Sequence, residues 1–219
     1  MVVLFVVLTV ILFVTIDYFV QKRKKVGFAA SQLSAPLPLS HIFGLVPGGV
    51  FLQRSLTWTK IQDNGELLLG INPILLGLVG QPDEIVLQTE SGSVEKGDTL
   101  IEIRKAGKSL EMKSPIKGEI TQFNTELSTE VNWESTSQNW LYKFKPLNVN
   151  EEIPNWLIAE SAQTWLKEKY QQIKEFFMQN LPQTELGPAL ADGGDLPTGL
   201  LSEFDENTWK KFSSEFIQK

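Results

Sequence analysis

The chain opens with a long apolar run. Residues Val2 to Val20 are interrupted only by two threonines and Asp17. A helix rises about 1.5 Å per residue, so a run of this length just spans a hydrocarbon core of about 30 Å. The pattern therefore predicts one transmembrane helix. Asp17 stands at the end of the run, and it is either a solvated group at the interface or a functional carboxylate within the membrane.

A basic cluster, Lys22–Lys25, follows the run. A cleaved signal peptide would carry its positive residues before the apolar segment and a small-residue cleavage site after it. The opposite order predicts an uncleaved, single-pass anchor with its N-terminus outside and the rest of the chain in the cytoplasm. The cluster also favours an anionic lipid surface.

The pattern changes after a Pro-rich stretch at 31–47. From Gly49 onward the chain shows short apolar runs at 50–61, 66–71, 84–89, 98–104, 109–114, 118–123 and 139–144. The Asp63-Asn64-Gly65 sequence between the first two runs is a strong hairpin signal. Many closely spaced short strands predict a small sandwich or barrel.

Helical spacing returns near the C-terminus. Residues 155–181 place Ala162, Trp165, Leu166, Tyr170, Ile173, Phe176 and Phe177 on one face. Asp205 is predicted to cap a last helix whose apolar face holds Trp209, Phe212 and Phe216. A small barrel covers about one such helix, so we expect another protein to cover the region around Trp209 and Phe212.

These patterns divide the chain into five parts. They are a transmembrane anchor with its basic cluster (1–25), a Pro-rich linker (26–48), a β domain (49–146), an amphipathic helix (147–182), and a Gly/Pro loop with a terminal helix (183–219). The loop contains Asp192-Gly193-Gly194-Asp195, which lacks the lysine of a P-loop and the spacing of an EF-hand. We interpret it as a turn.

Composition excludes several kinds of site. The chain has no cysteine and a single histidine, His41, so thiol chemistry, disulfides and multi-histidine metal sites are excluded. The net charge is -6, and it is -9 from Val26 onward (16 basic minus 25 acidic residues), which argues against nucleic-acid binding. We find no catalytic triad, metal constellation or nucleotide loop. We therefore expect a protein that is not an enzyme and holds no metal.

Several motifs in order carry a family resemblance. They are LTW at 56–58, GELLLGI at 65–71, GSVEKGD at 92–98, SPIKGEI at 114–120 and NWL at 139–141. Their order and spacing resemble the glycine cleavage H-protein. The resemblance implies a mainly β fold, the flattened barrel-sandwich hybrid of lipoyl and biotinyl carrier domains. This chain would add an N-terminal transmembrane helix and C-terminal amphipathic helices.

The resemblance also locates a candidate site. In that family a lysine at a hairpin tip, eight positions before the proline, receives lipoate. Counting back from Pro115 gives Gly107, and Arg104 stands where the family has glutamate. Lys108 is displaced by one residue from the position of the family's lysine, and Lys105 by two. A shift of one residue turns a hairpin side chain to the other face. The basic tip is either a solvated turn or a docking point for an acidic partner.

We therefore expect no cofactor, no catalytic residue and no metal ligand. The favoured hypothesis is a non-catalytic, H-protein-like accessory or scaffold subunit of a complex in the bacterial inner membrane, with a respiratory or redox complex as the candidate. Its partners would be the membrane and other protein subunits. The alternative is a genuine carrier with lipoate on Lys108 or Lys105.

Overall fold

The computed structural model describes residues 27–29, 39, 46, 48–124, 126–128, 139–181 and 194–218. The predicted transmembrane helix, the basic cluster at 22–25, His41 and Asp192 all lie outside these residues. Within the described ranges, no helix is both long and apolar enough to cross a membrane.

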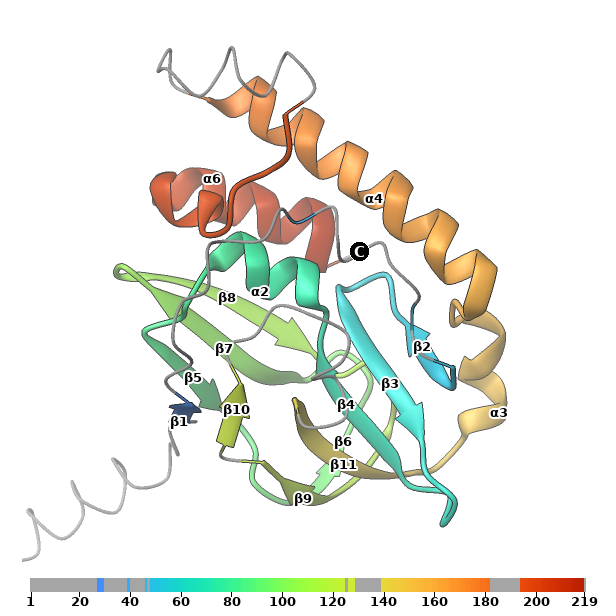
Figure 1. Cartoon of the computed structure of the whole chain (residues 1–219). Coiled ribbons are helices and arrows are strands. Elements are labelled where there is room, and N and C mark those ends of the chain that lie inside the picture. Colours follow the sequence, from blue (N-terminus) through green and yellow to red (C-terminus); the bar gives the residue numbers. More distant parts are fainter. Residues whose placement is uncertain are drawn as a thin grey trace, which may run out of the picture.

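Two antiparallel sheets form the body of the structure (Figure 1). The six-stranded sheet has the order β2 (Val50–Leu52), β3 (Thr57–Ile61), β4 (Leu67–Ile71), β11 (Trp140–Pro146), β9 (Gly118–Phe123) and β6 (Gly92–Val94). The three-stranded sheet has the order β5 (Glu84–Leu87), β7 (Thr99–Lys105) and β8 (Lys108–Lys113). A short parallel pair joins β1 (Gly27–Ala29) to β10 (Glu126–Ser128). The prediction of a mainly β domain is confirmed.

The first predicted strand is split into a hairpin. Strands β2 and β3 pair with each other across a turn in which Leu56 has a φ of 56°. Gln53 lies inside this turn and donates its amide to Thr59 (2.7 Å). The predicted β run at 50–61 therefore forms two strands, because a polar turn interrupts it. The next turn follows the Asx-Gly prediction, with Gly65 at a φ of 81°.

A short helix, α2 (Pro73–Val79), was not foreseen from the sequence. Asn72 caps it by accepting a hydrogen bond from the backbone N–H of Ile74 (3.0 Å). The helix ends at Gly80, which has a φ of 75°. Seven residues that are nearly all buried show no amphipathic period, so the pattern carried no helical signal.

Two contacts fix the core between the strands. The buried hydroxyl of Tyr142 on β11 donates to the carbonyl of Leu100 on β7 (2.9 Å), which joins the two sheets. Burial raises the pKa of Tyr142 well above its usual value. On β4, a Cβ added to Gly70 would lie 2.3 Å from ring carbons of Trp58. The glycine and tryptophan of the two motifs are thus cross-strand partners.

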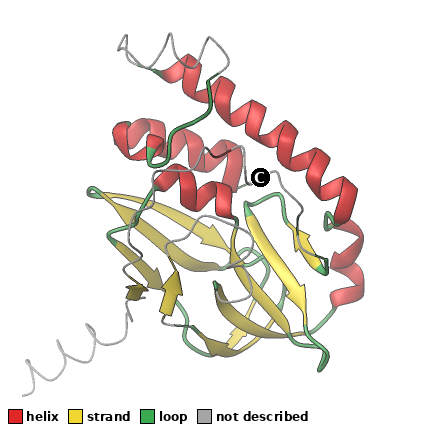
Figure 2. Cartoon of the chain, in the orientation of Figure 1, coloured by secondary structure: helices red, strands yellow, loops and turns green. Residues whose placement is uncertain are grey.

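Helices collect on one side of the sheets (Figure 2). After β11 come α3 (Val149–Glu152), the 3-10 turn η3 (Ile153–Asn155) and α4 (Ala159–Asn180). Near the C-terminus lie the 3-10 turn η4 (Leu200–Glu203), α6 (Glu206–Phe212) and the π-turn η5 (Ser213–Ile217). The main helix starts at Ala159 rather than near Asn155. The predicted cap of α6 is confirmed, since Asp205 accepts from the N–H of Thr208 (2.9 Å).

The final helix is covered by its own chain. The exposed fractions of Trp209 and Phe212 are 1% and 0%, so the expectation that another protein covers them is wrong. The reason is that α6 is inserted between α4 and β8 (Figure 1). The two helices therefore bury their aromatic faces on each other, and α6 also lies against β8.

Candidate functional site

A two-residue turn forms the tip of the β7–β8 hairpin. Ala106 and Gly107 have φ values of 49° and 74°, and Lys105 pairs directly with Lys108. Positive φ at both central residues is the pattern of a type I′ turn. A Cβ at Gly107 would meet no heavy atom within 4 Å. The backbone conformation, rather than any lack of space, therefore favours glycine at this position.

Asp83 clamps one side of the tip. Its Oδ1 accepts from Nζ of Lys105 (2.9 Å) and its Oδ2 accepts from the backbone N–H of Ala106 (2.7 Å). The hydrogen bond from Lys105, followed by that from Ala106, holds the pKa of Asp83 below its ordinary value. The Lys105 side chain is 28% exposed, so it lies along the surface with its amine engaged.

Lys108 extends toward the C-terminal region, whereas Lys105 extends toward Asp83. Side chains alternate along a strand, so Lys108 shares its face with the buried Leu110 and Met112. Its Nζ donates to the carbonyls of Ser202 and Phe204, each at 2.6 Å. The ammonium also lies 5.4 Å from the centre of the Trp209 ring, within the range of a cation–π contact.

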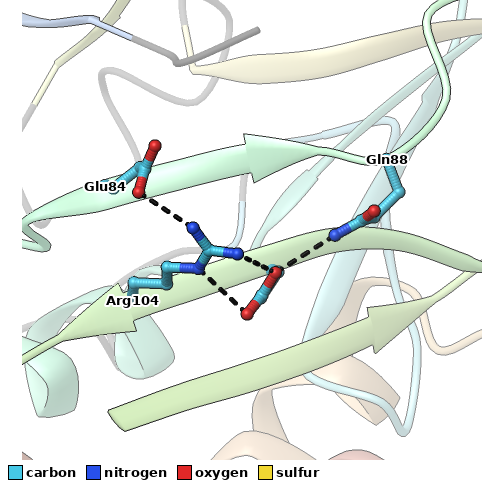
Figure 3. A network of polar contacts seen from close by, with 4 residues as sticks. Glu84, Gln88 and Arg104 are labelled. Carbon is cyan, nitrogen blue, oxygen red and sulfur yellow. Dashed lines mark hydrogen bonds and ion pairs between the residues drawn. The ribbon is translucent and has the colours of Figure 1, made fainter. Parts of the chain in front are cut away.

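Arg104 is paired on the outer face of the small sheet (Figure 3). Its guanidinium contacts both carboxylate oxygens of Glu102 (3.0 and 2.7 Å) and one oxygen of Glu84 (3.1 Å). Gln88 donates to the same Glu102 (3.1 Å). The hydrogen bond to Glu102 is the main reason that the pKa of Arg104 is raised.

The tip therefore does not present three free cations. Arg104, Lys105 and Lys108 each have partners within the described part of the chain. Two of these partners could not be read from the sequence: Asp83 lies 22 residues before Lys105, and the carbonyl of Ser202 lies 94 residues after Lys108. Backbone carbonyls leave no signal in side-chain patterns.

The described residues offer no metal site. Among them, no group of three or more His, Asp or Glu side chains comes together in a way that could hold an ion. The reactive groups at the tip are the primary amines of Lys105 and Lys108, and both are hydrogen-bonded within the chain.

Comparison with known proteins identifies the β domain. Residues 51–172, more than half of the chain, match the family model described as Glycine cleavage H-protein. The chain is 31% identical to the probable glycine cleavage system H protein of Thermococcus gammatolerans, over 56% of this chain and 92% of that protein. It is 22% identical to the glycine cleavage system H protein of Stenotrophomonas maltophilia K279a, over 48% and 83%.

A solved structure of a glycine cleavage system H protein from Mycobacterium marinum also matches. The sequence identity is 20% and the TM-score 0.37, over 46% of this chain and 86% of that one. The family match, which runs through the sheets and into α4, defines the class of the molecule as H-protein-like. The chain belongs to the glycine cleavage H-protein family. Residues 194–218, which contact the tip, lie beyond the matched segment.

Replacing Asp83 tests the clamp on the tip. The pKa of Asp83 is lowered in the fold, so its ionised form stabilises the protein above the unfolded pKa of about 3.9, and this contribution is lost as the pH falls through the folded pKa. We expect Asp83→Ala to lower the melting temperature at pH 7, and the difference from wild type to shrink below about pH 4. Asp63→Ala, at an exposed turn position, is the control. An equal effect of Asp83→Ala at both pH values would contradict the ionic clamp.

Proposed function

We propose that this chain is a non-catalytic, membrane-tethered member of the H-protein family that serves as an accessory or scaffold subunit of a membrane complex. The observation that carries the proposal is the hairpin tip. We infer from its spacing to Pro115 that Gly107 stands where the family carries its lipoyl lysine. Gly107 lies in a type I′ turn whose positive φ favours glycine.

The neighbouring amines support the same proposal. A carrier arm must leave the protein surface to move between active sites. The amine of Lys108 is instead held by two carbonyls of the C-terminal region, and that of Lys105 by Asp83. Attachment at Lys108 would require the C-terminal region to move aside first.

Membrane attachment rests on the apolar run 2–20 and the basic cluster 22–25. The charge asymmetry favours a domain on the cytoplasmic side of a bacterial inner membrane. A β domain without metal-ligand clusters in its described residues suits a docking role, in which any redox chemistry would belong to partner subunits.

A second candidate is a genuine lipoyl carrier, which family membership favours. Lys105 is then the better site, because its ion pair with Asp83 lies at the surface and such pairs are weak. Lys108 would have to give up two charge-assisted hydrogen bonds.

The intact mass of the protein purified from its native host separates the two candidates. We expect the unmodified mass, apart from removal of the initiator methionine, because neither amine at the tip is free. A Gly107→Lys variant expressed in the same host is the matched control, since it restores a lysine where a side chain has room. A lipoyl mass increase on Lys105 or Lys108 of the wild-type chain would establish the carrier function instead.

Protease accessibility tests the membrane topology. Protease added to inside-out vesicles should digest the region after Lys25, whereas intact spheroplasts should protect it. Replacing residues 22–25 with glutamine should scramble the orientation, because these charges determine it. Digestion in spheroplasts only, or recovery of the chain in the soluble fraction, would refute the proposed attachment.

A further inference from the structure

Several backbone carbonyls at the end of η4 accept hydrogen bonds from side chains elsewhere in the chain. A helical turn leaves its last carbonyls without intrahelical partners. Here Trp209 donates its indole N–H to the carbonyl of Leu201 (2.7 Å), and Lys108 donates to those of Ser202 and Phe204. The lysine of the hairpin thus caps a turn that lies more than 90 residues away in the sequence.

The C-terminal segment, defined here as residues 194–218, is held at separate points. Its Gly199 donates a backbone hydrogen bond to the carbonyl of Gly77 on α2 (2.7 Å). Its start is fixed to α4 by hydrogen bonds among Tyr170, Asp195 and the N–H of Leu196. At the hairpin, the charged contact is made by Lys108.

We propose that Lys108 is a latch that holds the C-terminal segment on the β7–β8 hairpin, and that loss of its positive charge releases η4 from the hairpin. The latch does not depend on membrane attachment or on the accessory role proposed above. Lipoylation of Lys105 would refute the accessory role, but it would leave the contacts of Lys108 with the C-terminal segment in place.

The chemistry of the amine makes docking and modification mutually exclusive. An ammonium has three N–H donors, and two of them are used by Ser202 and Phe204. An acylated lysine keeps one N–H and no charge. At least one carbonyl of the half-buried turn would then lose its partner, and the cation–π contact with Trp209 would be lost as well.

Amine reactivity tests the latch in the unmutated full-length protein. Limiting N-hydroxysuccinimide acetate is added, and the acetylation rate of each lysine is followed by mass spectrometry. Lys113 is the matched amine, because it lies exposed on the same strand. We expect Lys108 to be acetylated at least about tenfold more slowly than Lys113, because its amine is engaged in two charge-assisted hydrogen bonds. The difference should vanish in denaturant. Equal rates for the two lysines in the folded protein would overturn the proposal.

Substitutions of Lys108 test whether loss of its charge releases η4 from the hairpin. Lys108→Met keeps the apolar stem but removes the donors, and we expect amide hydrogen exchange in residues 200–209 to accelerate about tenfold or more while β9 stays protected. Lys108→Arg keeps the charge and should stay close to wild type. Lys143→Met removes a cation–π contact with Trp140 (5.0 Å) away from the C-terminal segment and should not change this exchange. Unchanged exchange in Lys108→Met would overturn the latch. If that variant unfolds throughout, the acetylation rates of the wild-type chain decide.

Discussion

Packing among phenylalanine rings determines where the C-terminal half of this chain lies. Phe176 and Phe177 of α4 contact Phe212 of α6 with ring centres 5.7 and 6.0 Å apart, and Phe216 and Phe204 complete the cluster. Burying a large aromatic side chain contributes roughly 1.5–3 kcal/mol, so the cluster stabilises the packing of α6 on α4. Because α4 lies near β2 and α6 lies near β8, the helical pair that these rings join lies against both sheets.

The position of α6 decides the chemistry of the hairpin tip. With α6 on β8, the end of η4 comes within reach of Lys108, and the amine that the sequence offers as a modification site becomes a cap for backbone carbonyls. Arg104 and Lys105 are paired with carboxylates that the β5 strand and the loop before it supply. A tip that is basic in sequence is therefore largely neutralised by the fold.

The sequence predicted what depends on local pattern. Most of the β runs, the turn at Gly65 and the cap at Asp205 are confirmed, because each follows from residues close together in the chain. Helix α2 was missed because a fully buried segment has no amphipathic period. The covering of Trp209 was predicted wrongly because the elements around α6, namely α4 and β8, are distant from it in sequence. The contact of Lys108 with Ser202 could not be predicted either, because the two residues are also distant in sequence.

The central claim is that the C-terminal segment is held on the β7–β8 hairpin through Lys108 and Trp209. Solution NMR tests it most directly, because a ring current shifts protons that lie against an aromatic face. The structure predicts upfield-shifted side-chain protons for Lys108 and nuclear Overhauser contacts between them and the Trp209 ring, since Nζ lies 5.4 Å from the ring centre. Chemical shifts of a freely solvated lysine, with no contact to Trp209, would contradict it.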